Sequence, residues 1–233
     1  IKHNFSEIKD ESDYRSNVPM STYTDYMDYI ARFRQGGRNL LTSYELYSLL
    51  ETSGSTETYE GGKFIPLTIE SLKRYGDAMD RFLSLHRKEN GGKRLYISFF
   101  RSNLSEEVRP ENPMLFMTAY YRYNYENGYI SADELAGGEV VNFFPFACDY
   151  MYAKLWLAFS NSRLTSMESV YLYDILIFFH YFEDNYEDVL SDVKNKKVSS
   201  SVMLPERVRS YLEGLDISED RISEIRRECS SGF

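Results

Sequence analysis

Apolar side chains recur at intervals of three and four residues along much of the chain, which is the spacing of one face of a helix. The first such segment begins near Tyr23 and ends at Gly36-Gly37, with Tyr26, Met27, Ile30 and Phe33 on one face. Comparable stripes predict further helices over residues 67–85, 114–122, 131–142, 146–159, 167–190, 205–213 and 218–229. The pattern therefore predicts an all-α fold, and only residues 95–100 fit a short strand as well as the start of a helix.

A second helix is predicted directly after the first one. Thr42 suits the position before a helix and Glu45 follows three residues later, the arrangement of a capping box. Leu41 can pack on Leu46, and Leu49 continues the apolar stripe. The run Thr165-Ser166-Met167-Glu168 repeats the same box and predicts another helix start.

Breaks in these patterns divide the chain into five parts. The segment 103–113 contains two prolines and several charges, and this composition is typical of a linker. The Ser-, Thr- and Gly-rich residues 52–62 have no apolar periodicity and are predicted to be a loop insertion. The predicted organisation is an extended arm, an N-terminal helical lobe, a linker, a C-terminal helical lobe and a helical tail, over residues 1–20, 21–102, 103–113, 114–197 and 198–233.

The first pair of predicted helices resembles an EF-hand, the calcium-binding helix-loop-helix. If Glu45 is the twelfth residue of the loop, the loop starts at Arg34, and Phe33 and Leu41 occupy positions that are apolar in that family. Residues 123–134 align in the same way, with Gly128 at the sharp turn. Two weaker copies, starting at Arg87 and Ser160, would complete two pairs of hands.

The ligands of such a site are largely missing. Calcium requires six to eight oxygen ligands, which the loop normally supplies from positions 1, 3, 5 and 12. In the first loop the early positions are Arg34, Gly36 and Arg38, so two cations stand where carboxylates are needed. In the third loop Asn127 and Glu134 are the only conventional ligands. The resemblance therefore implies degenerate EF-hand-like units without calcium.

This resemblance implies a non-catalytic structural or interaction subunit with no cofactor. Paired hands of that family expose an apolar groove that receives a partner helix, and here Phe, Tyr and Met would line it. The expected partner is a protein within a hetero-oligomeric assembly. Two alternatives remain open, namely a calcium-responsive regulator and an enzyme on an unrecognised helical scaffold.

Composition narrows the choice of partner and compartment. The 233 residues carry a net charge of −9, which disfavours binding to nucleic acid phosphates. The apolar segments are too short or too charged for a membrane span. Cys148 and Cys229 are too few for a disulfide framework, which predicts a reducing, intracellular compartment. Because the chain starts at Ile1, a processed N-terminus and a mitochondrial location are also expectations.

Few residues offer catalytic chemistry. His180 lies near Glu183 and Asp184 on one predicted helix face, a set that could hold a metal or tune a proton donor. The other histidines are His3 and His86, and the apolar residues around Cys148 would make that thiol inert. The Gly-Gly pairs, including Gly61-Gly62, lack the spacing of a phosphate loop and are predicted to end helices.

Overall fold

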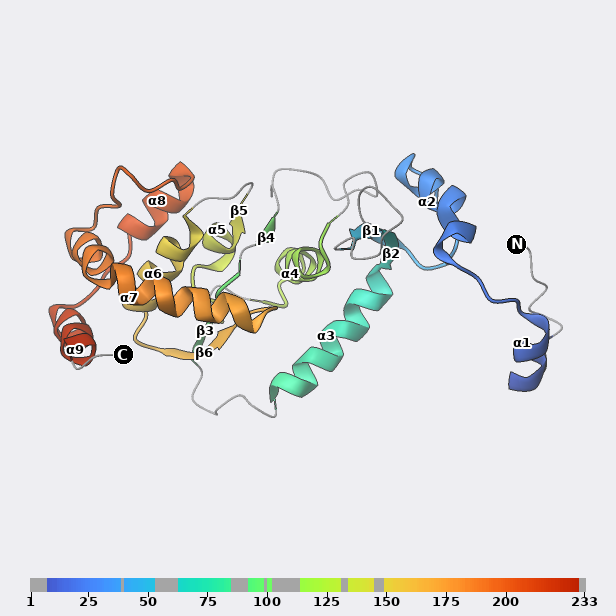
Figure 1. The fold of residues 1–233 in the computed structure, drawn as a ribbon, viewed down its shortest axis with the longest axis horizontal. Coiled ribbons are helices and arrows are strands. Elements are labelled where there is room, and N and C mark those ends of the chain that lie inside the picture. The colour runs from blue at the N-terminus through green and yellow to red at the C-terminus, as the bar shows by residue number, and fades with distance from the viewer. Residues whose placement is uncertain are drawn as a thin grey trace. The chain divides into compact units, whose positions relative to one another are not determined.

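The computed structural model describes residues 8–38, 40–52, 63–84, 92–98, 100–101, 114–130, 134–144 and 149–230 (Figure 1). The helices are α1 Glu11–Asn17, the short 3₁₀ helix η2 Tyr23–Tyr26, α2 Met27–Arg34, α3 Ile69–Ser84, α4 Phe116–Glu126, α5 Gly138–Asn142, α6 Tyr150–Ser160, α7 Leu172–Asn195, α8 Glu206–Glu213 and α9 Glu219–Ser230. The strands are β1 Leu46–Glu51, β2 Phe64–Thr68, β3 Lys93–Tyr96, β4 Phe100–Arg101, β5 Phe143–Phe144 and β6 Leu164–Glu168. The described residues thus form a mixed α/β fold with three two-stranded sheets, and the prediction of an all-α fold is wrong.

The chain divides into two compact units. The first comprises residues 1–74 and 108–116, and the second comprises residues 75–107 and 117–233. Helix α3 contributes residues to both. None of the helices in the described ranges is long and apolar enough to cross a membrane.

The core of the first unit joins α2 to an antiparallel hairpin of β1 and β2. Ile30 and Phe33 of α2 are buried against Leu46 and Leu49 of β1. Gly36, which follows the C-cap residue Gln35 of α2, has a φ of 85°. This left-handed conformation ends a helix, and glycine adopts it without strain. The helix predicted from the Tyr23–Phe33 stripe is confirmed, as η2 followed by α2.

The second helix predicted for this unit is wrong, because residues 46–51 form β1. The ladder between β1 and β2 pairs Leu46 with Thr68 and Ser48 with Leu67, so β1 carries an extra residue at a bulge. The bulge changes which side chains face the core, and Leu46 and Leu49 are therefore both buried although they are three residues apart. Two buried leucines three residues apart have the spacing expected for one face of a helix, although here they lie on a strand.

The capping box at the same place does not form either. The Thr42 hydroxyl accepts a hydrogen bond from the amide of Tyr44 in a local turn, at 3.1 Å. Arg34 lies over the ring of Phe64, with its guanidinium carbon 4.9 Å from the ring centroid. The first EF-hand-like unit is thus absent, because the second of its two helices is a strand.

The third EF-hand-like unit is also absent. Residues 123–126, the predicted start of its loop, belong to α4, and the next described helix begins at Gly138. Gly128 does make a sharp turn with φ 70°, but it lies two residues after the end of α4, where left-handed glycines are common. The helix predicted over residues 131–142 is reduced to α5 in the described part of that range.

The second unit is organised around the parallel strands β3 and β6. Leu95 of β3 pairs with Met167 of β6, and on its other side β3 forms an isolated bridge from Arg94 to Leu135. Strand β6 occupies the place of the predicted capping box Thr165–Glu168. That prediction failed because the strand is stabilised by pairing with residues about seventy positions away, which a local pattern does not reveal.

Helices α6, α7, α8 and α9 supply most of the core of the second unit (Figure 1). Helix α6 is buried along nearly its whole length, and Trp156, Leu155 and Leu157 are almost completely inaccessible. Lys154 is fully buried as well, with Nζ 2.5 Å from the side-chain oxygen of Asn142. The helices predicted at 205–213 and 218–229 are confirmed as α8 and α9.

Buried tyrosines in this unit predict a loss of stability at alkaline pH. Burial raises the pKa of Tyr181 to about 12, and it also raises the pKa values of Tyr96 and Tyr121. The unfolded chain ionises its tyrosines near pH 10, so above that pH it binds fewer protons than the folded chain. The stabilisation is complete below pH 10 and is lost as the pH rises toward 12.

We therefore expect the urea midpoint of the full-length protein to fall between pH 8 and pH 11. Absorbance at 295 nm, which reports tyrosine ionisation, should rise together with unfolding. A midpoint that does not change over this range would contradict the prediction.

Candidate functional site

Polar side chains gather where the parallel strands β3 and β6 of the second unit end. Ser98 follows β3, Ser169 follows β6, and Asp174 lies in the first turn of α7. The Ser98 and Ser169 hydroxyl oxygens are 2.9 Å apart, and both hydroxyls donate to Oδ2 of Asp174, from Ser169 at 2.7 Å. Ligands of open α/β sheets bind outside the carboxyl ends of parallel strands, so this edge is a candidate binding site.

The strands beneath this cluster carry further polar groups. Arg94 of β3 is about 90% buried and lies 3.4 Å from the carboxylate of Glu168 of β6. The ring of Tyr96 packs against that of Tyr121, with centroids 5.2 Å apart. Burial, followed by the charge of Asp174, raises the pKa of Tyr96 above the ordinary tyrosine value. The hydroxyl is protonated at neutral pH, as in any tyrosine, and can donate a hydrogen bond.

A second candidate is the connection between β1 and β2 in the first unit. The amide of Thr52 donates to the carbonyl of Lys63, and the amide of Lys63 donates to the hydroxyl of Thr52, both at 2.9 Å. Residues 53–62 lie outside the described ranges. Their sequence contains Ser53-Gly54-Ser55-Thr56 and Gly61-Gly62. The prediction that Gly61-Gly62 ends a helix falls on residues outside the described ranges.

The two residues suggested as calcium ligands lie in separate surroundings. Asn127 follows the last turn of α4, and its side-chain nitrogen donates to the carbonyl of Tyr123 at 2.8 Å. Glu134 lies beside β3, where its backbone carbonyl accepts a hydrogen bond from the amide of Arg94 at 2.8 Å. The residues between them include 131–133, which are outside the described part of the chain.

The histidine and carboxylates suggested as a metal site lie on α7. Nδ1 of His180 is 3.5 Å from a carboxylate oxygen of Glu183, and the His180 side chain is 79% exposed. Asp184 is exposed on the same helix. Among the described residues, no group of three or more His, Cys, Asp or Glu side chains is placed to hold a metal ion.

The remaining candidates are three residues outside the described ranges and one buried cysteine. His3, His86 and Cys148 belong to segments whose structure is not described. Cys229 of α9 is free and buried, and burial raises the pKa of its thiol. A high thiol pKa leaves little thiolate at neutral pH, so Cys229 is a poor nucleophile.

Comparison with known proteins identifies the family. The model of the GH3 family N-terminal domain matches residues 1–233. The chain belongs to the GH3 family. Indole-3-acetic acid-amido synthetase GH3.10 from Arabidopsis thaliana is 24% identical over 232 residues, and jasmonoyl-L-amino acid synthetase GH3.5 from Oryza sativa subsp. japonica is 24% identical over 230 residues. Both alignments cover 94% of this chain, but only 38% and 39% of those relatives.

Solved structures agree on the fold. The GH3 member AtGH3.15 acyl acid amido synthetase, in complex with 2,4-DB, superposes with a TM-score of 0.72 at 20% sequence identity. The match covers 95% of this chain and 39% of that chain. A second structure, GH3.15 acyl acid amido synthetase, gives a TM-score of 0.71 at 19% identity.

These findings overturn two predictions from the sequence. The resemblance to EF-hands is wrong, because the whole chain matches the GH3 family and neither the first nor the third EF-hand-like unit forms. The weaker copy at Ser160 is replaced by β6, and the one at Arg87 begins outside the described ranges. The prediction of a non-catalytic structural subunit is wrong as well, since the relatives are amido synthetases and therefore enzymes. The alternative of an enzyme agrees with the comparisons, on a mixed α/β scaffold instead of a helical one.

Proposed function

We propose that this chain is part of an acyl acid amido synthetase, which joins the carboxyl group of a small organic acid to the amino group of an amino acid. The observation that carries this proposal is the match of the GH3 family N-terminal domain to all 233 residues. The relatives named above form such amides with indole-3-acetic acid and jasmonic acid as their acids.

Amide formation from a free carboxylate needs activation, because the carboxylate is a poor electrophile and its oxygen a poor leaving group. A nucleoside triphosphate can supply the activation. A carboxylate oxygen attacks the α-phosphorus, the bond from that phosphorus to the bridging oxygen breaks, and pyrophosphate leaves. The amine then attacks the acyl carbon, the nucleoside monophosphate leaves, and the amine releases a proton to solvent.

The connection between β1 and β2 has the composition to bind the phosphates. Residues 52–56 provide four hydroxyl groups around Gly54, and the connection ends at the cation Lys63. Glycines allow backbone amides to approach a phosphate closely, and hydroxyl and ammonium groups add further donors. The hydrogen bonds between Thr52 and Lys63 hold the two ends of the connection together, so a bound phosphate would not have to close the loop.

The proposal is tested on the full-length protein with ATP, magnesium and a panel of aryl and aliphatic carboxylic acids, each offered with twenty amino acids. We expect exchange of labelled pyrophosphate into ATP that depends on the acid, and amide products detected by mass spectrometry. Reactions without the acid serve as the control. Folded protein that shows neither acid-dependent exchange nor an amide product would contradict the proposal.

A further inference from the structure

The polar cluster at the ends of β3 and β6 has used all of its hydroxyl protons. Ser98 and Ser169 each donate their single hydroxyl proton to Oδ2 of Asp174. The Tyr96 hydroxyl is hydrogen-bonded to Ser98, and it has to be the donor because Ser98 has no second proton. Oδ1 of Asp174 has no hydrogen-bond partner within the described ranges. The cluster therefore offers acceptors to a ligand, and the ligand has to supply the donor.

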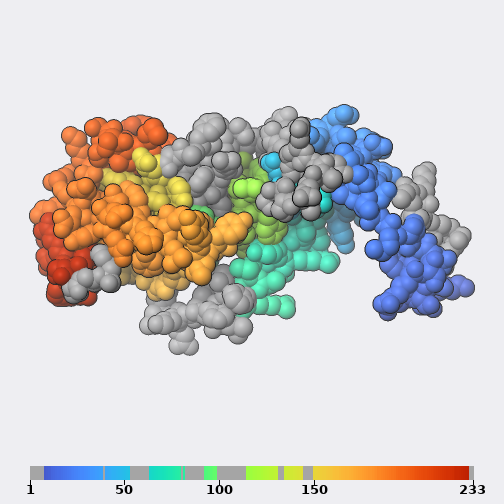
Figure 2. All heavy atoms as spheres, in the orientation of Figure 1, coloured from blue at the N-terminus to red at the C-terminus, as the bar shows by residue number. Residues whose placement is uncertain are grey.

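The cluster is anchored in the core and is also open to solvent. Tyr96 is only 2% exposed, whereas Ser98, Ser169 and Asp174 are partly exposed. Asp174 lies in the first turn of α7, and Figure 2 shows the orange residues of α7 at the surface. Ligands of open α/β sheets bind outside the carboxyl ends of parallel strands, which is where these side chains meet.

Acceptors of this kind do not suit a carboxylate. The carboxyl group of an organic acid is ionised at neutral pH, so beside Asp174 it would meet a like charge with no proton to share. Arg94 of β3 is already paired with Glu168 at 3.4 Å. The amino acid substrate of the proposed reaction is disfavoured for the same reason, because its carboxylate lies next to its amino group. A hydroxyl group supplies a donor without a charge.

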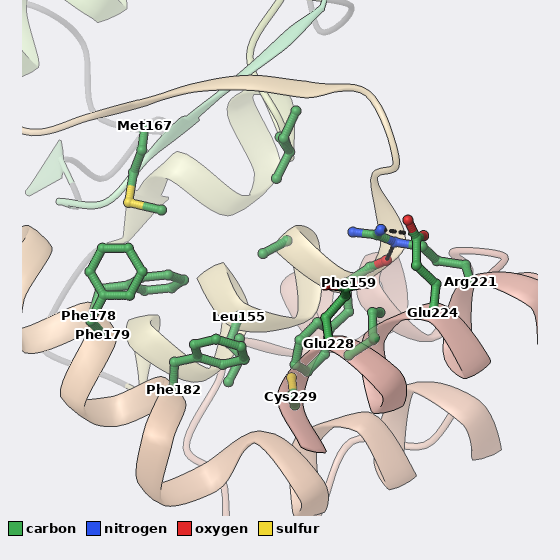
Figure 3. A pocket seen from close by; sticks show the side chains of 13 residues that line it. Leu155, Phe159, Met167, Phe178, Phe179, Phe182, Arg221, Glu224, Glu228 and Cys229 are labelled. Carbon is green, nitrogen blue, oxygen red and sulfur yellow. Dashed lines mark hydrogen bonds and ion pairs between the residues drawn. The ribbon is translucent and has the colours of Figure 1, made fainter. Parts of the chain in front are cut away.

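The apolar pocket on β6 does not suit a hydroxyl group. It has a volume of about 290 Å³, and Met167 of β6 points into it together with Phe178 and Phe182 of α7 (Figure 3). Arg221 at one end of the pocket is paired with Glu224 at 2.6 Å (Figure 3). A hydroxyl buried against the apolar walls would lose its hydrogen bonds to water without replacement. The strand ends are therefore the better place for such a group.

We propose that Ser98, Ser169 and Asp174 determine substrate specificity by binding a hydroxyl group of the organic acid, whose proton is donated to Oδ1 of Asp174. The inference rests on the proposed function for the class of ligand, an organic acid, and adds the substituent that this chain selects. The hydroxyl lies at the end of the acid away from its carboxyl group, because a carboxylate is disfavoured beside Asp174. The substrate is thus a hydroxy acid whose two polar groups are separated by the rest of the molecule.

Three matched acids test the proposal on the full-length protein: phenylpropanoic acid and its para-hydroxy and para-methoxy derivatives. The far end of the hydroxy acid donates a hydrogen bond, that of the methoxy acid only accepts, and that of the parent acid does neither. We expect the hydroxy acid to bind about 10–10²-fold more tightly than the parent acid, the usual effect of a hydrogen bond to a charged acceptor. The methoxy acid should bind no more tightly than the parent acid. The rise in melting temperature at equal concentrations of each acid measures the binding.

Asp174→Asn distinguishes recognition of the hydroxyl from a structural role of the same side chain. The serine hydroxyls keep the amide oxygen at the Oδ2 position, so the amide N–H groups take the place of Oδ1. The preference for the hydroxy acid should therefore fall, and the methoxy acid should gain affinity relative to the parent acid. Asp184→Asn, at an exposed carboxylate farther along α7, is the matched control and should keep the preference of the unmodified protein. A purely structural role would not change the order of the three acids.

The outcomes separate this proposal from the proposed reaction. Equal affinity for the three acids, no binding of any of them, or a preference that Asp174→Asn leaves unchanged would overturn the recognition of a hydroxyl group. Failure of the proposed function is a different result, namely the absence of acid-dependent pyrophosphate exchange and of amide products. A preference for the hydroxy acid that depends on Asp174 would support the recognition site even if no amide forms.

Discussion

Replacing Trp156 by alanine is expected to lower the free energy of unfolding by about 3–5 kcal/mol, the range for large aromatic truncations in a packed core. Trp156 is completely buried in α6 and packs beside Tyr152, with ring centroids 5.9 Å apart. Because α6 is surrounded by the other core helices of its unit, the structure can collapse only partly into the cavity. The urea midpoint of the full-length protein, followed by circular dichroism, measures the loss.

Two further variants make this prediction specific. The Trp156 indole N–H is buried and has no hydrogen-bond partner among the described residues, so Trp156→Phe removes an unsatisfied donor along with part of the ring. It should therefore cost much less than Trp156→Ala. Met203→Ala, at a residue that is 70% exposed, should change stability by less than about 0.5 kcal/mol. A Trp156→Ala variant as stable as Met203→Ala would contradict the packing described here.

Local patterns predicted the helices much better than the strands. Helices α2, α3, α6, α8 and α9 have apolar faces or end signals that can be recognised within a dozen residues. Each strand error had a physical cause. In β1 the bulge placed Leu46 and Leu49 on the same buried side, and in β6 the run from Thr165 to Glu168 has the composition of a capping box.

The candidate site was harder to predict than the fold. Ser98 and Ser169 meet at Asp174 only because β3 and β6 are parallel neighbours, and no local pattern relates residues so far apart. The composition of segment 52–62 identifies it as a loop, but its role as the connection of a hairpin depends on the strands on either side. If residues 46–51 are a helix, the hydroxyl and glycine residues after them are a loop insertion, whereas between β1 and β2 they form the connection of a hairpin.

Lys63→Ala is expected to reduce kcat/KM for ATP in the amide-forming reaction by about 10²–10³-fold, the usual effect of removing one donor from a site where charge develops. The change removes the cation at the exit of the connection between β1 and β2. It should leave the hairpin intact, because the bonds between Thr52 and Lys63 use only the backbone of Lys63. Acid-dependent exchange of pyrophosphate into ATP measures the first step directly.

The controls distinguish phosphate binding from a structural role of the same side chain. Nζ of Lys63 also lies 5.7 Å from the ring centroid of Tyr23, a cation–π contact worth about 0.5–1 kcal/mol at an exposed site. Tyr23→Leu removes that contact, together with the hydrogen bond that the Tyr23 hydroxyl accepts from the amide of Phe64 at 2.8 Å, and keeps the cation. Any loss of exchange activity should therefore be no larger than its loss of melting temperature explains. Lys9→Ala, which removes an exposed cation from the same unit, should retain all of it. If Lys63→Ala loses activity only in proportion to its melting temperature, or if Tyr23→Leu loses as much, then Lys63 supports the hairpin and does not bind the phosphates.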